Sequence, residues 1–167
     1  MITGLAEVFG HELIAGFKYA FRGYNFAVWT FAGCTLRVSG QPMACYIAKE
    51  APVISYGNVH AVLHQRREAS RGLGRTGPRV MIVGPQEVGK STLARILANY
   101  AVKMGGRPMF VDLDTADSKV ALPGTIAAVS VDRPLNASGE FDSHFDPVVR
   151  QSVGLVWVQP PMLSRCP

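Results

Sequence analysis

The sequence predicts an α/β protein in which a small β-sandwich-like domain precedes a parallel βαβ unit. Three patterns support this prediction. Short β-type segments separated by glycines fill residues 5–56, a continuous apolar run occupies 79–83, and apolar side chains with helical spacing follow at 93–104. With 167 residues, 48% of them hydrophobic, the chain is long enough to bury a core.

The N-terminal β domain is predicted to cover residues 1–69. Its β-type segments are AEVF, FKYAF, FAVWTF, TLRV, ACYIA and VISY. Glycines and a proline separate these segments, as turns separate the strands of a small sandwich or barrel. A short helix follows at 58–69, with Asn58 as its N-cap.

This predicted helix has two different faces. They carry Val59, Val62 and Leu63 on one side, and His60, His64 and Arg67 on the other. We expect the histidine face to be solvated. The two histidines stand one turn apart, but no acidic third ligand accompanies them locally, so no metal site is predicted.

A glycine-rich, basic segment at 70–78 is predicted to be the linker between two domains. With its flanks it concentrates the arginines Arg66, Arg67, Arg71, Arg75 and Arg79. Two interpretations remain open for them: a solvated hinge, or a surface that meets RNA phosphates. The formal net charge of +5 makes a polyanionic partner plausible but is equally compatible with mere solubility.

The cysteines and the lengths of the apolar runs indicate in which cellular compartment the protein is expected. The three cysteines, Cys34, Cys45 and Cys166, are widely spaced and form no CxxC pair, which argues against a disulfide framework or a zinc site. A reducing intracellular compartment is expected. The N-terminal stretch lacks the pattern of a signal peptide, and the longest apolar runs are too short to span a bilayer, so we expect no secretion and no membrane partner.

The second half of the chain is predicted to form the βαβ unit. The run RVMIV at 79–83 has the character of a strand buried on both faces. The helix after it has an apolar stripe made of Leu93, Ile96, Leu97, Tyr100, Ala101 and Met104. Two glycines at 105–106 end this helix, and MFVDLD at 109–114 supplies a second strand, which we expect to be parallel to the first with a right-handed crossover.

Between the first strand and the helix, Gly84 to Ser91 satisfy the pattern G-x-x-x-x-G-K-[ST]. Glycines there allow backbone N–H groups to close around phosphate oxygens, and the helix adds the positive end of its dipole. Lys90 is expected to reach the β- and γ-phosphates, and Ser91 to ligate Mg²⁺. The predicted nucleotide-binding residues are Gly84, Glu87, Val88, Gly89, Lys90, Ser91 and Thr92.

The second predicted strand ends in the acidic residues Asp112 and Asp114, with Asp117 just beyond. At the carboxyl end of a parallel strand, Asp114 would emerge beside the phosphate loop. There it is expected to ligate Mg²⁺ or to accept the proton of an attacking hydroxyl, with Asp112 as the second candidate. The alternative is that one of the three only caps the next turn. No Asn/Thr-Lys-x-Asp segment is visible, which disfavours a GTPase.

Several segments together resemble one family. They are GLAEVFGHEL at 4–13, TFAGCTLRVSG at 30–40, GPRVMIVGPQEVGKST at 77–92, LANYAVKMGGRPMFVDLD at 97–114 and LPGTIAAV at 122–129. The chain is similar over about residues 4–141 to the polyribonucleotide 5′-hydroxyl kinase subunit of pre-mRNA cleavage complex II, the Clp-type kinase family.

This resemblance implies a nuclear protein that binds ATP and Mg²⁺ and transfers the γ-phosphate to the 5′-hydroxyl end of RNA. Lys90 and Asp114 would be its catalytic residues, and Ser91 and Asp114 its metal ligands. The implied protein partners are subunits of the pre-mRNA cleavage factor and the tRNA-splicing endonuclease. The implied architecture is an N-terminal small β-sandwich-like domain followed by an incomplete P-loop NTPase domain at 79–141.

The chain also departs from this family pattern. Asp117 stands where the family has a glutamine, and Phe26 where it commonly has a lysine. A glutamate upstream of the first residue, the arginine-bearing lid and the C-terminal domain of the family are not expected in this chain. The tail at 142–167 is expected to be divergent and poorly ordered. Two functions are therefore open: an RNA 5′-hydroxyl kinase, or an ATP-binding scaffold of the cleavage factor without turnover.

Overall fold

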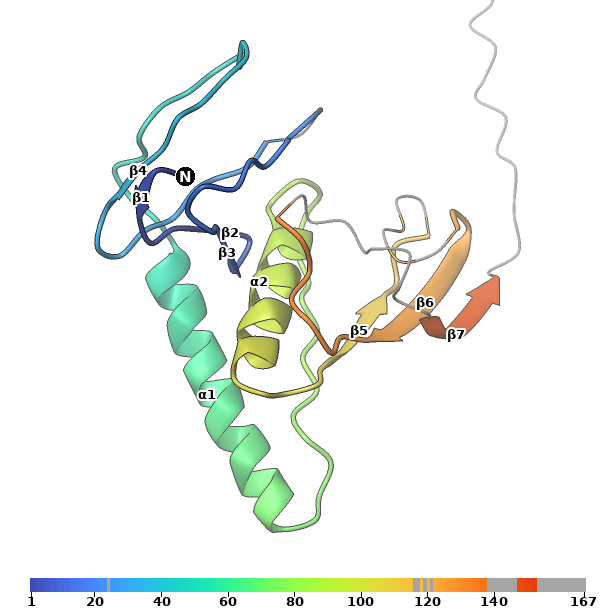
Figure 1. The fold of residues 1–167 in the computed structure, drawn as a ribbon. Coiled ribbons are helices and arrows are strands. Elements are labelled where there is room, and N and C mark those ends of the chain that lie inside the picture. Colours follow the sequence, from blue (N-terminus) through green and yellow to red (C-terminus); the bar gives the residue numbers. More distant parts are fainter. Residues whose placement is uncertain (24, 116–117, 119, 121, 138–146, 153–167) are drawn as a thin grey trace, which may run out of the picture.

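The computed structural model describes residues 1–167 except 24, 116–117, 119, 121, 138–146 and 153–167. In the described residues the chain forms short strands, two helices and a small sheet (Figure 1). The elements are β1 (Thr3–Gly4), β2 (Glu7–Val8), β3 (His11–Glu12), β4 (Cys34–Thr35), α1 (Val53–Gly72), α2 (Lys90–Lys103), β5 (Met109–Asp112), β6 (Thr125–Ser130) and β7 (Pro147–Ser152).

The N-terminal part forms two antiparallel strand pairs, β1 with β4 and β2 with β3. Ala6, Val8 and Leu13 are its buried core, and Ala137, from the segment after β6, packs into the same cluster. The predicted β character is therefore confirmed around 6–9, whereas 44–48 form no strand. Since Ala137 belongs to this core, the chain returns to the N-terminal domain between β6 and β7.

Helix α1 is longer than the sequence predicts. It starts at Val53, with Pro52 rather than Asn58 at the N-cap, and it runs to Gly72. It therefore includes the segment VISY, predicted as a strand, and the first residues of the predicted linker at 70–78. Pro52 has a φ of −74°, which suits a helix start, and the β-propensity of Val53, Ile54 and Tyr56 depends on a partner strand that they do not have among the described residues.

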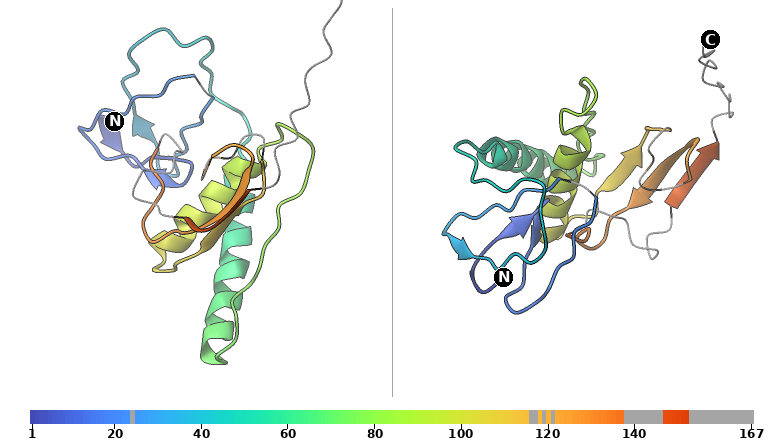
Figure 2. Two further views of the ribbon diagram at one scale, coloured as in Figure 1. Left: turned by 90° about the vertical axis from the view of Figure 1, so that its right-hand side faces the viewer. Right: turned by 90° about the horizontal axis from the view of Figure 1, so that it is seen from above.

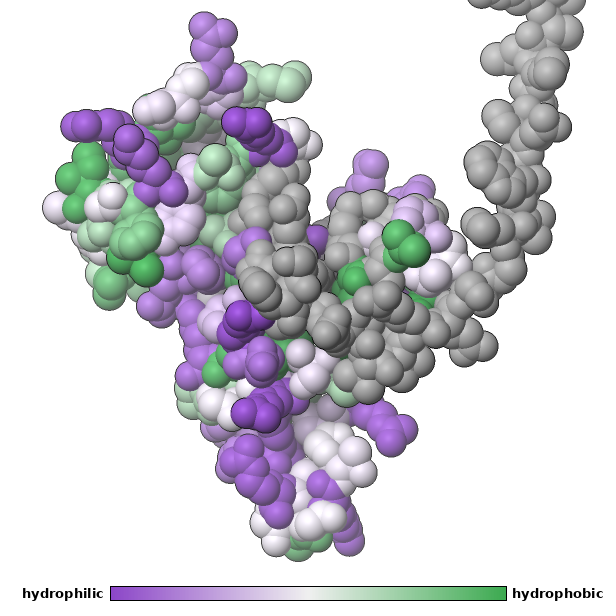
Figure 3. Space-filling model, turned by 45° about the vertical axis from the view of Figure 1, so that its right-hand side comes forward, coloured by the Kyte–Doolittle hydropathy of each residue, from purple (hydrophilic) through white to green (hydrophobic). Residues whose placement is uncertain are grey.

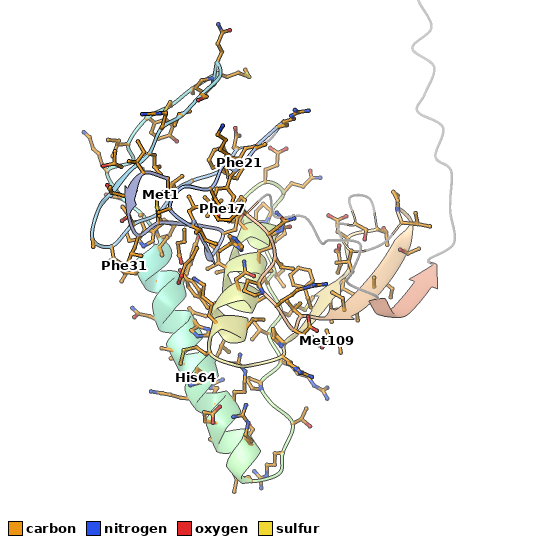
Figure 4. All side chains as sticks on the ribbon, in the orientation of Figure 1. Met1, Phe17, Phe21, Phe31, His64 and Met109 are labelled. Carbon is orange, nitrogen blue, oxygen red and sulfur yellow. The ribbon has the colours of Figure 1, made fainter. Side chains whose placement is uncertain are left out.

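The face of α1 predicted to be solvated is the one that packs, so this prediction is wrong. The ring centroid of His60 lies 5.6 Å from that of Tyr100 on α2, in an edge-on arrangement. Val59 and Val62 are instead 45% and 50% exposed. His64 follows one turn further along the same helix (Figure 4). Burial, together with the nearby Arg67 and His64, lowers the pKa of His60.

This lowered pKa makes the α1–α2 contact sensitive to pH. The unfolded chain takes up the His60 proton near pH 6.5 and the folded chain only at a lower pH, so the free energy of unfolding should fall as the pH drops below 6.5. His60→Gln should flatten this dependence, by a fraction of the roughly 1.4 kcal/mol per pH unit of a full proton because His60 is partly exposed. Urea unfolding midpoints of the wild type and of His60→Gln at several pH values measure this pH dependence. An equal change of midpoint with pH in both proteins would contradict the role of His60.

The sheet is antiparallel, which differs from the predicted parallel βαβ unit. Strand order is β5-β6-β7, with Met109 opposite Ser130 and Asp112 opposite Ala127. Residues 79–83 form no strand, and Val80, Met81 and Val83 are 53%, 78% and 78% exposed. The physical reason is pairing: β5 pairs with the next strand along the chain, and the apolar run at 79–83 does not join this sheet.

Helix α2 lies between the N-terminal strands and α1 on one side and the sheet on the other (Figure 2). Its buried residues are Ile96, Ala98, Asn99 and Ala101, whereas Met104, part of the predicted stripe, is 58% exposed. Towards the sheet, Val102 and Phe110 pack against the buried cluster of Val129, Val131 and Leu135.

Strand β7 falls within the tail at 142–167 that was expected to be poorly ordered, so this expectation is wrong for residues 147–152. The rest of that tail lies outside the described residues. Among the described cysteines, Cys34 and Cys45 are free. No helix within the described ranges is long and apolar enough to cross a membrane.

Candidate phosphate-binding site

Residues 84–89 form an exposed loop that leads directly into α2. Gly89 is the N-cap of α2 with a φ of +87°, and no side chain caps the helix there. Glu87, also in the loop, has a φ of +60°. The first N–H groups of an α-helix have no partner inside the helix, so these groups at the start of α2 are available to an anion.

The two glycines of the motif have separate structural roles. A Cβ at Gly84 would lie 3.3 Å from Cγ2 of Val88, so a side chain there would press on the loop. A Cβ at Gly89 would meet nothing within 4 Å, but its left-handed backbone disfavours any other residue. The backbone of this loop therefore favours glycine at position 89, whereas a side chain at position 84 would require the exposed Val88 side chain to shift by a few tenths of an ångström.

Lys90, Ser91 and Thr92 lie together in the first turn of α2, as predicted from the motif. The Lys90 ammonium donates a hydrogen bond to the carbonyl of Pro85, so its side chain turns back across the loop. Ser91 is exposed, and Lys90 and Thr92 are half-buried. A positive charge, two hydroxyls and uncapped N–H groups on one short segment fit the phosphates of a nucleotide.

The acidic residues follow β5, which ends at Asp112. Asp112 accepts a hydrogen bond from the N–H of Asp114 at 3.1 Å and one from the Ser118 hydroxyl at 3.3 Å. Asp112 thus caps the turn after β5, the role that the sequence left open for one of Asp112, Asp114 and Asp117. Asp114 lies beyond the strand end with an exposed side chain. Asp117 is outside the described residues.

Strand β5 runs in the opposite direction to α2, so its carboxyl end points to the same side of the molecule as the start of α2 (Figure 1). Within the described ranges no group of three or more His, Cys, Asp or Glu side chains could hold a metal. Mg²⁺ at nucleotide sites usually takes only one or two carboxylates, with the substrate phosphates and water as further ligands. A serine hydroxyl and one carboxylate, Ser91 and Asp114, are consistent with that pattern, and their meeting at one ion remains a prediction.

Sequence reasoning missed Asn99, which connects three parts of the chain. Its side chain is fully buried on α2. Its Nδ2 donates to the carbonyl of Phe9 at 2.8 Å, and its Oδ1 accepts from the N–H of Leu135 at 2.7 Å. The signal in the sequence was a polar amide beside the apolar stripe of a helix, where a buried amide needs specific partners.

A polar cluster lies beside Asn99 on the same helix. The Tyr100 hydroxyl donates to the carboxylate of Glu7, and Lys103 lies 3.4 Å from Glu7 and 3.1 Å from Glu12. Burial, and then the hydrogen bond to Glu7, raises the pKa of Tyr100. The helix that starts at the phosphate loop is therefore held against the N-terminal domain by hydrogen bonds and ion pairs.

A glycine loop that opens onto an uncapped helix defines this chain as a P-loop nucleotide-binding protein with an N-terminal β domain. Residues 1–70 match the family model of the N-terminal beta-sandwich domain of polyadenylation factor, and residues 84–152 match the model of the mRNA cleavage and polyadenylation factor CLP1 P-loop. The chain belongs to the CLP1 family. The family match extends past residue 141, where the resemblance in the sequence was expected to end.

Two curated relatives are the CLP1 homologs of Drosophila yakuba and Drosophila melanogaster. Each is 45% identical over 142 residues, which are 84% of this chain and 34% of the relative. A wild-type Clp1p–Pcf11p complex is similar in structure, with a TM-score of 0.68 and 26% identity over 81% of this chain and 32% of that one. The chain spans about a third of the length of these relatives.

A second solved structure, on the extended interface between Pcf11p and Clp1p and the basis of ATP loss in a point mutant, matches with a TM-score of 0.68. Its identity is 25%, over 82% of this chain and 32% of that chain. These matches confirm the predicted architecture of a β-sandwich-type domain followed by a P-loop domain.

Proposed function

We propose that this chain carries the nucleotide-binding part of an ATP-dependent polynucleotide 5′-hydroxyl kinase-like subunit of the mRNA 3′-end cleavage factor. The observation that carries the proposal is the uncapped start of α2, with Lys90 turned across the loop. The CLP1 family match supports a role in mRNA cleavage and polyadenylation. A nuclear location follows from that role as part of the same proposal.

ATP and Mg²⁺ are the proposed ligands of the phosphate loop. Support for ATP comes from the similar Clp1p structure that concerns ATP loss in a point mutant. The loop N–H groups from Gly84 to Gly89 would hold the β- and γ-phosphates, and Lys90 would leave Pro85 to bind their oxygens. The Ser91 hydroxyl would ligate the metal ion, which neutralises phosphate charge.

In the proposed transfer, Asp114 orients the 5′-hydroxyl of RNA and accepts its proton. A bond forms between the 5′-oxygen and the γ-phosphorus, while the bond from that phosphorus to the bridging oxygen of ADP breaks. Lys90 stabilises the negative charge that develops on the transferred group and on the departing ADP. The side chains thus act mainly by positioning and charge neutralisation.

A scaffold function is the second candidate, and a specific finding favours it. Both similar solved structures contain Clp1p together with Pcf11p, which supports cleavage-factor proteins as partners. In this alternative ATP would stabilise the fold without being consumed. The tRNA-splicing endonuclease is proposed as a further partner on the family resemblance alone.

Transfer of labelled γ-phosphate to a 5′-hydroxyl oligoribonucleotide separates the two functions. We expect label on this RNA and none on the same oligonucleotide carrying a 5′-phosphate, because only the first has a free acceptor oxygen. Label on neither RNA, together with normal ATP binding, would contradict the kinase and favour the scaffold.

A further inference from the structure

The positive charge of this protein is concentrated in one short segment. Residues 66–79 carry five arginines and one glutamate, so this segment has a formal charge of +4, compared with +5 for the whole chain. We call these residues the arginine segment. They include the last turns of α1 and the chain that returns towards the phosphate loop, and hydrophilic residues lie along that part of the surface, with neutral and hydrophobic residues at its tip (Figure 3).

The arginine segment is a defined structure and not the open linker that its glycines predicted. The N–H of Arg75 donates to the carbonyl of Ser70 at 2.9 Å, and the N–H of Gly74 to that of Arg71 at 3.2 Å. With Gly74 at a φ of +63°, this is a Schellman motif that ends α1 and reverses the chain. A Cβ at Gly77 would lie 3.9 Å from Cγ of Arg67, so the return chain passes beside the helix.

Among the residues that the structure describes, most of these guanidinium groups have no acidic partner. Arg71 pairs with Glu68 at 3.0 Å, while Arg66, Arg67, Arg75 and Arg79 form no ion pair with a described carboxylate. Nη1 of Arg67 is buried and has no hydrogen-bond partner among the described atoms. The helix dipole favours cations in the last turn of α1, but it does not explain Arg75 and Arg79, which lie beyond the helix. A polyanion would supply the negative charge that these four arginines lack among the described residues.

We propose that the arginine segment binds the phosphate backbone of single-stranded RNA. Every basic residue in it is arginine, whose planar fork matches phosphate oxygens with paired hydrogen bonds. The return chain continues through 79–83 into Gly84, so RNA bound here would lie beside the segment that enters the phosphate loop. The family description as an mRNA cleavage factor favours RNA over an acidic peptide. This binding needs neither ATP nor phosphate transfer.

The test measures RNA binding by the full chain in the absence of nucleotide. The readout is the fluorescence anisotropy of a 5′-labelled single-stranded oligoribonucleotide at several salt concentrations. The variant R66Q/R75Q/R79Q removes three exposed arginines of the segment. The matched control R22Q/R37Q/K49Q removes three exposed charges from the loops of the N-terminal domain. The variant should bind RNA at least about tenfold more weakly, and its slope of log affinity against log salt should shrink by about 2, near 0.7 per lost contact.

Three outcomes would overturn this proposal: wild-type affinity in the variant, an equal loss in the control, or binding of a poly-glutamate peptide of the same charge as tightly as the RNA. The last result would assign the segment to an acidic protein partner. R66Q/R75Q/R79Q should still bind MgATP as the wild type does, because none of these three arginines lies in the phosphate loop or the first turn of α2. A failure of the proposed kinase activity can therefore be distinguished from a failure of RNA binding by the arginine segment.

Discussion

Lys90→Ala should weaken MgATP binding by about 10- to 100-fold, because a charge-assisted hydrogen bond to phosphate contributes roughly 1.5–3 kcal/mol. In the free protein the Lys90 ammonium already lies over the loop, on the carbonyl of Pro85, so little rearrangement is needed to reach a phosphate. Phosphate transfer should fall further, by roughly 10²-fold or more, because the charge also stabilises the transition state.

Isothermal titration calorimetry measures the binding change, and labelled phosphate transfer measures the second change. Lys49→Ala is the matched control, since Lys49 is an exposed lysine in the N-terminal domain. A Lys90→Ala protein that binds MgATP as tightly as the wild type would contradict the role given to this side chain.

Asn99→Ala should lower the free energy of unfolding by roughly 2–4 kcal/mol, because it leaves two backbone groups without their partner. These are the carbonyl of Phe9 and the buried N–H of Leu135, which Asn99 bonds at 2.8 and 2.7 Å. The loss loosens the N-terminal domain and the segment after β6 from α2 at the same time.

Two further substitutions sharpen this test by urea unfolding. Asn99→Asp keeps an acceptor for Leu135 but brings a second oxygen against the carbonyl of Phe9, so it should also destabilise the protein. Asn58→Ala is the control, because Asn58 is exposed on α1. If Asn99→Ala costs no more than Asn58→Ala, the three segments are not held together through this amide.

Local patterns correctly predicted a loop at 84–89 followed by a helix, and phosphate binding by this loop stays a prediction. The motif residues lie close together in sequence, in one loop and the first turn of α2, and include Gly84, Gly89 and residues 90–92. Their arrangement therefore depends little on distant partners. The same holds for the β character near Val8, which was visible in its short apolar segment. Placement of Asp114 at the phosphate loop depends on distant chain, and it stays a prediction.

Long-range contacts decided what the sequence alone could not predict. Residues 79–83 have the composition of a buried strand, but β5 pairs with β6 and leaves that run outside the sheet. The apolar face of α1, with Val59 and Val62, stays largely exposed, whereas the histidine face contacts Tyr100 on α2, a contact that the sequence of α1 alone does not contain. Asn99 likewise acquires its role from Phe9 and Leu135, which are far away along the chain.

The claim that the loop at 84–89 grips the phosphates of a nucleotide is tested most directly by titrating MgATP into the full chain. We expect saturable binding of one ATP per chain with a dissociation constant below about 1 mM, in the usual range for nucleotide substrates. Inorganic triphosphate should compete for the site and adenosine should not. Absence of binding at several millimolar, or competition by adenosine alone, would contradict the claim.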